Sequence, residues 1–236
     1  MEIPKISLLT WNLWHTGPCE AHRIDAVSKT IAQLDPDVLY LQEVTRVTME
    51  QLSETLWWKC YHRSRDVRKV QEGQEWYFTL LLLKASTFDL ESSFLEKLFP
   101  NTIMGRYLLA SLKFLQTHCS GEVLAAGDMN WIEDDQPAWS LPEGWCDPWE
   151  VLMPEDPGYT YDCHRNQMLP WNGYRSRLDR IWCRLQEWKP MHIELVGLSK
   201  LKNVRALDNK RVILPSDHFG IYAMFVKRAS PGRRKA

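Results

Sequence analysis

Apolar and polar positions along the first forty residues predict a strand, a helix and a second strand. The run over 6–11 is apolar and rich in β-forming residues, and it ends on the polar Asn12, as a buried strand with a polar tip does. From Ala21 to Leu34 the apolar residues share one helical face, and an Asp-Pro-Asp sequence ends that helix. The run over 38–41 predicts the next strand. This opening predicts a layered α/β domain.

Similar patterns predict the elements of the remaining chain. They are helices over 48–57 and 108–117, and strands over 76–84, 123–126, 159–162, 178–184, 193–198 and 219–226. The charged segment 63–75 and the Pro- and Trp-rich segment 131–157 are predicted to be loops. We expect one domain over 1–227, followed by a basic, disordered tail over 228–236.

Charge and cysteine usage narrow the class of protein. The 236 residues carry a net charge of −1, so any hold on nucleic acid must come from a local site. Six scattered cysteines without a C-x-x-C pair are typical of a reducing compartment. The N-terminus does not resemble a secretory signal, and the apolar run over 76–83 is too short to span a bilayer. We expect a monomer in the nucleus or the cytoplasm, neither secreted nor bound to a membrane.

Short polar motifs lie at the ends of several predicted strands. Carboxylates, amides and an imidazole that converge at such ends suit a hydrated divalent cation and a phosphate group. In chain order the motifs are Thr10-Trp11-Asn12, Leu41-Gln42-Glu43-Val44, Ala126-Gly127-Asp128-Met129-Asn130, Leu178-Asp179-Arg180-Ile181 and Pro215-Ser216-Asp217-His218.

The first three motifs offer carboxylates and amides to this chemistry. Glu43 can ligate Mg²⁺, and the alternative is a strand-terminal Glu that faces solvent. Asn12 can hold the metal or a phosphate oxygen, although a lone Asn is more often a turn former. Asp128 can orient or deprotonate the attacking water and Asn130 can bind the phosphate, whereas an Asx-rich turn is the structural alternative.

The last two motifs pair an imidazole with carboxylates. Asp217 is a potential metal ligand, and His218 can donate to a phosphate oxygen while Asp179 holds its far nitrogen. The alternative is a histidine packed ahead of the last strand. A serine hydrolase is not indicated, because no G-x-S-x-G elbow is present. Zinc-protease and Gly-rich phosphate-loop motifs are also absent from the sequence.

Tryptophan is frequent in the segments beside these motifs. An exposed indole there can stack on a base or on an aromatic leaving group, and core packing is the alternative. The tryptophans concerned are Trp131, Trp139, Trp145, Trp149 and Trp171.

With these motifs in this order, the chain resembles the endonuclease/exonuclease/phosphatase superfamily of Mg²⁺-dependent phosphodiesterases. Three further stretches resemble its tyrosyl-DNA phosphodiesterase 2-like branch, namely 99–106, 158–162 and 215–220. The resemblance implies a four-layered α/β sandwich of the deoxyribonuclease I type, with two packed sheets between helices. It also implies hydrolysis of 5′-phosphotyrosyl DNA ends, which abortive topoisomerase II leaves, with Mg²⁺ or Mn²⁺ as the cofactor.

The resemblance assigns a role to each motif. Glu43 ligates the metal with help from Asn12 and Asp217, Asp128 positions water, Asn130 and His218 contact the phosphate, and Asp179 orients His218. We also expect three residues to bind substrate: Arg106, Trp131 and Tyr159.

One region departs from the superfamily pattern. Relatives carry a β-hairpin, a His-Leu-x-Ser motif and a helix between the Met-Gly-Arg segment and the Gly-Asp-x-Asn strand, and the motif histidine also donates to the phosphate. Here 21 residues separate Arg106 from Asp128, which is enough for one helix and one strand. A sandwich short of two strands and a helix follows, with His118 as a poor substitute for the missing donor.

Two other functions stay open beside the leading one. One is a general nuclease or a phosphatase for a small phosphoester within the same superfamily. The other is a catalytically silent variant that binds DNA or a protein partner, which the missing histidine favours.

Overall fold

A six-stranded mixed sheet forms the centre of the computed structural model, which describes residues 3–66, 77–89, 106–131, 140–204 and 212–229. Its strand order is β3-β4-β2-β1-β10-β9. The strands are β1 (Lys5–Asn12), β2 (Val38–Val44), β3 (Tyr61–Arg63), β4 (Phe78–Lys84), β9 (Trp188–Val196) and β10 (Gly220–Lys227). β1 runs parallel to β2 and antiparallel to β10. The first and last strands of the chain are therefore neighbours at the middle of the sheet.

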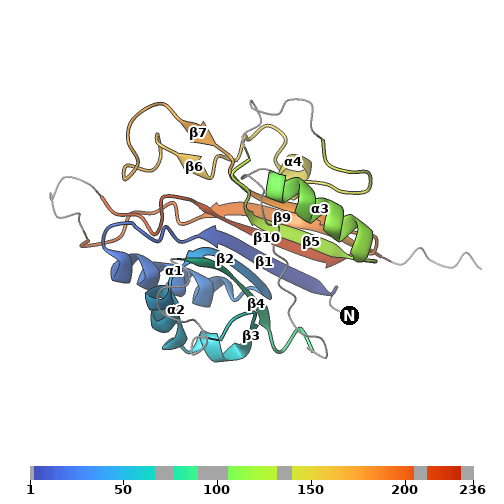
Figure 1. Ribbon diagram of the computed structural model, residues 1–236, viewed down its shortest axis with the longest axis horizontal. Helices are drawn as coiled ribbons and strands as arrows, with labels where there is room; N and C mark the ends of the chain where they lie inside the picture. The colour runs from blue at the N-terminus through green and yellow to red at the C-terminus, as the bar shows by residue number, and fades with distance from the viewer. Residues whose placement is uncertain (1–2, 67–76, 90–105, 132–139, 205–211, 230–236) are drawn as a thin grey trace, which may run out of the picture.

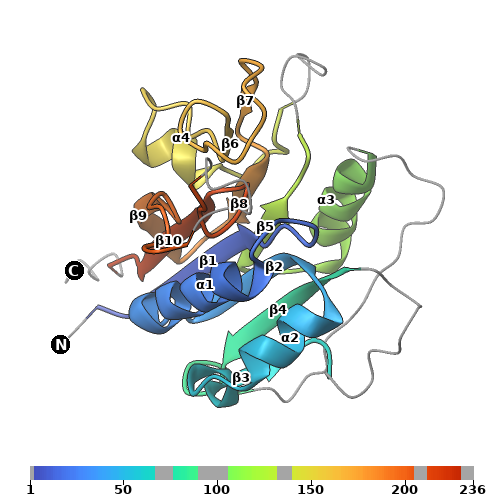
Figure 2. The same ribbon diagram turned by 90° about the vertical axis from the view of Figure 1, so that its left-hand side faces the viewer.

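Helices α1 (Glu20–Leu34) and α2 (Arg46–Ser53) cover one face of this sheet (Figures 1 and 2). α1 is the crossover between the parallel strands β1 and β2, and its apolar face enters a core with Leu9, Leu39 and Leu80. α2 begins and ends earlier than the predicted helix over 48–57. Thr45 caps it by accepting from the Thr48 amide at 3.0 Å, and a separate 3₁₀ turn follows over Trp57–Cys60.

Two further strands, β5 (Val123–Asp128) and β8 (Asp179–Arg184), pair antiparallel and pack on the other face of the sheet. Leu8, Ile181 and Phe225 lie in the core between the two sheets. Helix α3 (Arg106–His118) covers the outer side of this pair, where Leu112 packs with Val123 and Trp182. Helices, sheet, sheet and helix form four layers, so the predicted α/β sandwich is confirmed (Figure 2).

The sequence predicts one helix and one strand between Arg106 and Asp128, and the structure has α3 and β5 there. Within the described residues, the second sheet consists of β5 and β8. A largely apolar cavity of about 260 Å³ lies between the sheets, where Tyr40 and Leu83 face Leu124.

Residues 140–157, which were predicted to be part of a loop, contain a short helix. This helix is α4 (Pro148–Leu152), which Asp147 caps by accepting from the Trp149 amide at 2.8 Å. The strand predicted over 159–162 is only β6 (Tyr161–Asp162), which pairs with β7 (Arg175–Ser176) in a small separate sheet (Figure 1).

Parts of three predicted segments lie outside the described residues. They are most of the loop over 63–75, the first residue of the strand over 76–84, and residues 230–236 of the tail. The described part of the tail is bonded, since the Arg228 amide donates to the Glu187 carbonyl at 2.6 Å. No helix among the described residues is long and apolar enough to cross a membrane.

Candidate active site

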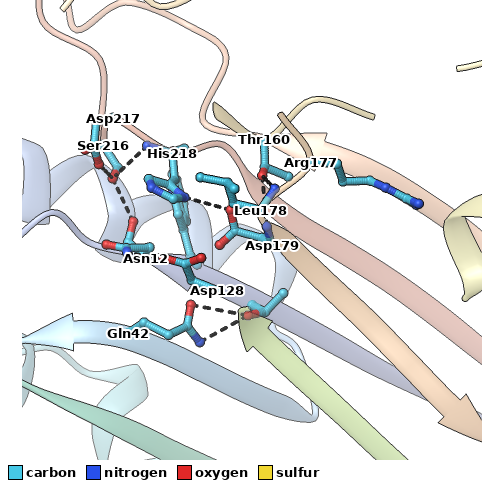
Figure 3. A network of polar contacts seen from close by, with 12 residues as sticks. Asn12, Gln42, Asp128, Thr160, Arg177, Leu178, Asp179, Ser216, Asp217 and His218 are labelled. Atoms are coloured by element: carbon cyan, nitrogen blue, oxygen red, sulfur yellow. Dashed lines mark hydrogen bonds and ion pairs between the residues drawn. The ribbon is translucent and has the colours of Figure 1, made fainter. Parts of the chain in front are cut away.

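The polar ends of strands from both sheets meet at one place (Figure 3). Parallel pairing of β1 and β2 sets Asn12 opposite Gln42, so Asn12 and Glu43 reach the same edge. The Asn12 amide nitrogen donates to Glu43 Oε1 at 3.1 Å and to Asp128 Oδ2 at 3.0 Å. Because Glu43 lies on the six-stranded sheet and Asp128 on the second sheet, Asn12 joins the two layers.

Glu43 lies where the pairing of β2 with β4 becomes irregular. Its φ of 54° is unusual for a residue with a side chain, and such backbone strain is found most often at functional sites. Its Oε2 accepts from the His15 amide at 3.0 Å and lies 2.6 Å from His15 Nδ1. Burial alone would raise the pKa of Glu43, but the hydrogen bonds from His15 and Asn12 lower it. Glu43 is thus an ionised carboxylate at neutral pH.

Asp128 and Asn130 form an Asx turn directly after β5. The Asn130 amide donates to Asp128 Oδ1 at 2.9 Å, and Asn130 adopts a left-handed backbone with a φ of 46°. The turn leaves Asn130 exposed. Burial, and then the negative charge of Asp179, raise the pKa of Asp128. A carboxylate with a raised pKa is a better proton acceptor, so the turn and the proposed chemistry are compatible.

A buried ion pair joins His218 to Asp179, with 2.7 Å between His218 Nδ1 and Asp179 Oδ2. Asp179 is fixed at the start of β8, where its amide and that of Leu178 donate to Thr160 Oγ1 at 3.0 Å. Burial alone would lower the pKa of His218, but the neighbouring carboxylates, Asp179 foremost, raise it to about 10. The imidazole is therefore protonated at neutral pH and can donate from its other nitrogen.

Asp217 lies on the Glu43 side of the site. Ser216 Oγ donates to the Asn12 carbonyl at 2.7 Å and also lies 3.2 Å from Asp217 Oδ1. Burial, and in part the charge of Glu43, raise the pKa of Asp217 to about 6. Asn166 fixes this turn, because its amide donates to the carbonyls of Ser216 and Asp217 at 2.8 and 3.1 Å.

Two groups of side chains are candidates for a cation site, and their chemistry favours one of them. Oxygen and nitrogen atoms of Asp128, Asp179 and His218 lie within 4.8 Å of one another. A protonated imidazole is a donor and not a ligand, so this group suits water and phosphate better than a metal. The ionised Glu43 and Asp217, which is near enough to feel its charge, offer carboxylate oxygens of the kind that Mg²⁺ prefers. Asn12 orients Glu43, because its amide nitrogen donates to that carboxylate while its amide oxygen accepts from the Trp14 amide.

The three residues expected to bind substrate are not among the contacts of this centre described above. Arg106 begins α3, and its side chain lies outside the described part of the chain. Trp131 is 3% exposed and packs in the core between β8 and α3, which favours core packing, the alternative, over substrate binding. Tyr159 lines a separate cavity of about 630 Å³, where the Arg175 guanidinium lies 4.5 Å from the centre of its ring.

The other tryptophans singled out in the sequence include both buried and exposed side chains. Trp145 and Trp149 are buried, which supports core packing over stacking on a substrate, whereas Trp171 is 75% exposed. Trp139 lies outside the described residues. His118 is exposed in the last turn of α3 and stacks on Phe114, so it does not replace the missing donor.

Sequence reasoning missed His15, Tyr161 and Arg23. Tyr161 lies with its ring centre 5.3 Å from that of His218. Arg23 is fully buried and donates to the carbonyls of Leu13 and Pro215 at 2.9 and 3.1 Å. An arginine on the apolar face of the predicted helix was the available signal for Arg23. His15 and Tyr161 have no such signal, because their loops acquire neighbours only in the folded chain.

Residues 9–218 match the Endonuclease/Exonuclease/phosphatase family, and the chain belongs to it. It is 29% identical to tyrosyl-DNA phosphodiesterase 2 of Mus musculus and 30% identical to that of Xenopus laevis, with 92% and 93% of this chain covered. The fold is also that of Danio rerio tyrosyl-DNA phosphodiesterase 2 complexed with single-strand DNA product. That structure has a TM-score of 0.73 and 23% identity, with 94% of this chain and 98% of that chain covered.

The chain is shorter than these relatives. It spans 65% of the mouse protein and 66% of the Xenopus laevis protein. The mouse alignment runs over 258 positions although it covers 92% of these 236 residues. The relatives thus carry residues within the aligned region that have no counterpart here, as the shortened segment before Asp128 predicts.

Proposed function

We propose that the chain is a Mg²⁺-dependent phosphodiesterase that hydrolyses 5′-phosphotyrosyl DNA ends, with Mn²⁺ as a possible substitute. The observation that carries this proposal is the join between Glu43, Asn12 and Asp128 beside the Asp179–His218 pair. It brings two carboxylates and a protonated imidazole around one centre, which supports roles for Glu43 in metal binding, Asp128 as a base and His218 as a donor. The names of the relatives supply the substrate class.

The residues divide into a metal side and a water side. Glu43 would hold the cation with help from Asn12 and Asp217, and a bound cation would polarise a phosphate oxygen. On the other side, Asp128 accepts a hydrogen bond from the attacking water and takes its proton as the bond to phosphorus forms. The bond from phosphorus to the tyrosyl oxygen breaks, and the tyrosine leaves as a phenolate that takes up a proton from solvent.

Phosphate binding falls to Asn130 and His218. The side-chain amide of Asn130 is exposed to solvent and donates to one phosphate oxygen. The far nitrogen of the protonated His218 donates to another, and its positive charge offsets the negative charge that gathers on the phosphate in the transition state. Asp179 keeps His218 protonated and oriented throughout.

We propose a slow enzyme, because the His-Leu-x-Ser donor has no counterpart. Removal of one such donor typically costs on the order of a hundredfold in rate. His218, Asn130 and the metal remain, so the loss need not be complete. We further propose that the chain acts as a monomer on DNA ends in the nucleus or the cytoplasm.

Release of tyrosine from a 5′-phosphotyrosyl oligonucleotide tests the proposal. We expect release with Mg²⁺ or Mn²⁺ and none in excess EDTA. Glu43→Gln should abolish it while circular dichroism shows an intact fold, and His118→Ala should behave as the unchanged chain. Full activity in EDTA would contradict the metal assignment. Faster cleavage of an unmodified oligonucleotide or a small phosphomonoester would favour the general nuclease or phosphatase.

A catalytically silent variant is the second candidate, and the missing donor segment favours it. It would bind Mn²⁺ and single-stranded DNA and release no tyrosine at any enzyme concentration. Fluorescence anisotropy with a labelled oligonucleotide, run beside the tyrosine assay, separates it from a slow enzyme.

A further inference from the structure

Two cysteine side chains meet at the edge of the second sheet that faces away from β5. Cys146 and Cys183 form an isolated antiparallel bridge there. The Cys146 amide donates to the Cys183 carbonyl at 2.8 Å, and the Cys183 amide donates to the Cys146 carbonyl at 2.9 Å. Their sulfur atoms lie 3.4 Å apart and face the core between the two sheets.

The backbone geometry of this bridge fits a covalent bond between the sulfurs. In an antiparallel pair that exchanges both hydrogen bonds, the Cα atoms lie about 5.5 Å apart. Disulfides form over Cα separations of roughly 4.4 to 6.8 Å, with a bond of about 2.05 Å. The sulfurs therefore need to approach by about 1.4 Å. Rotation of the two side chains supplies part of this approach, and a small shift of the backbone at the bridge supplies the rest, because Cβ atoms are more widely spaced in a hydrogen-bonded pair than in a disulfide.

The environment also distinguishes the two thiols. Cys146 is partly exposed and reachable by a small oxidant, whereas Cys183 is fully buried. A hydrogen bond from the Cys183 thiol lowers the pKa of Cys146 to about 7, and the same contact, with burial, raises the pKa of Cys183. Cys146 is thus the thiol that supplies a thiolate near neutral pH, and the thiolate is the nucleophile in disulfide exchange.

We propose that Cys146 and Cys183 form a reversible disulfide when a low-molecular-weight disulfide such as oxidised glutathione accumulates. The Cys146 thiolate attacks one sulfur of oxidised glutathione and releases a first glutathione thiolate. Cys183 then loses its proton to solvent, attacks Cys146 Sγ and expels the second glutathione thiolate. Two protein thiols are oxidised and one glutathione disulfide is reduced to two thiols. In a reducing compartment the pair returns to the dithiol.

The bond would reinforce a weak edge of the molecule. Within the described residues the second sheet has two strands. On the edge of β8 that faces away from β5, the backbone pairs with this bridge. The next residue, Asp147, caps α4 and pairs with Arg177 at 3.2 Å. A disulfide between residues that are 37 positions apart also restricts the unfolded chain. The oxidised protein should therefore be the more stable form.

Peptide mapping of the full chain after treatment with oxidised glutathione tests this inference. We expect a tryptic peptide pair linked through Cys146 and Cys183 without reductant, lost on addition of dithiothreitol. The melting temperature should rise by roughly 5–10 °C on oxidation. Cys146→Ser should remove both the linked peptide and the rise, and Cys146→Ala serves if the serine variant does not fold. Cys60→Ser, at an exposed cysteine, should retain both.

Three results would overturn the inference. One is a Cys146 that stays a free thiol while Cys60 reacts. Another is a stable mixed disulfide between Cys146 and glutathione, because Cys183 would then be unable to attack. The third is a linked peptide with no change in melting temperature, because the bond would then not brace the sheet.

Discussion

At the scale of single residues, the amide of Asn12 has the largest structural consequence. Its two hydrogen bonds reach carboxylates on different sheets, Glu43 on one and Asp128 on the other. The sequence places each of these residues at the end of a strand. It does not show that one amide contacts both, because that depends on how the sheets pack.

Replacement of Asp179 by asparagine should move the alkaline limit of activity. The pKa of His218 is raised to about 10, so its protonated form persists at neutral pH and is lost as pH rises through about 10. In Asp179→Asn the limit should fall toward the ordinary histidine value of about 6.5 or below. A pH–rate profile measures this shift, with His118→Ala as the control.

The ion pair between Asp179 and His218 should also make stability depend on pH. Because folding raises the pKa of His218, the contribution of the pair to the free energy of unfolding is fully present below about pH 6.5 and is lost as pH rises through about 10. Urea unfolding at pH 6 and pH 10 should show a larger loss for the unchanged chain than for Asp179→Asn. Equal losses would mean that the pair is not formed in solution.

His15→Ala should weaken metal binding without unfolding the chain. His15 Nδ1 lies 2.6 Å from Glu43 Oε2 and holds that carboxylate in place. Loss of a partner that orients a metal ligand typically reduces affinity about 10- to 100-fold. Titration with Mn²⁺, followed by calorimetry or electron paramagnetic resonance, measures the change. An unchanged affinity would show that Glu43 is oriented without His15.

At the scale of elements, Arg23 joins α1 to the two loops that carry the site. Its guanidinium donates to the carbonyls of Leu13 and Trp14 after β1 and of Pro215 before β10. The carbonyls of Leu13 and Pro215 are buried, and the loss of their partner would be costly. α1 therefore does more than cover the sheet, because it fixes the end of β1 at Asn12 relative to the loop that contains Asp217.

Arg23→Met should lower the free energy of unfolding by about 3 kcal/mol, since it leaves several buried carbonyls unpaired. Arg46→Met, which removes an exposed ion pair with Glu50 in α2, should cost less than about 1 kcal/mol. Urea denaturation of both variants measures the difference. Similar costs for the two would show that water replaces the Arg23 contacts.

At the scale of the whole molecule, the second sheet has two strands within the described residues, which is fewer than the family resemblance leads us to expect. The cavity of about 260 Å³ between the sheets is lined mainly by apolar side chains. An insertion that restores the family hairpin and His-Leu-x-Ser segment should follow the Met-Gly-Arg segment, at the start of α3. Insertion after Leu109 would interrupt that helix.

Such an insertion directly after Arg106, at the start of α3, should raise the rate of tyrosine release on the order of a hundredfold, because it restores a phosphate donor. It should also reduce the binding of the dye ANS, because the added strands cover apolar surface. The same insertion with alanine in place of its histidine should reduce dye binding but leave the rate low. A chain that already works at the rate of complete relatives would contradict the argument.

The sequence by itself determined the order of strands and helices along the chain, the α/β class and the motifs of the site. These follow from local periodicity and from polar residues at strand ends, which do not depend on distant neighbours. The family resemblance added the four layers, and the count of residues before Asp128 predicted the missing strands.

The tertiary structure alone decided which side chains touch. Trp131 was expected at the substrate and is buried under α3, because the indole is large enough to fill the gap between that helix and β8. Arg23 reaches the Pro215 carbonyl because β10 pairs with β1, and His15 reaches Glu43 because β1 pairs with β2. Cys146 meets Cys183 through a bridge on the edge of β8. Separations of tens of residues leave no periodic trace in a sequence, so only the packed sheets bring such pairs together.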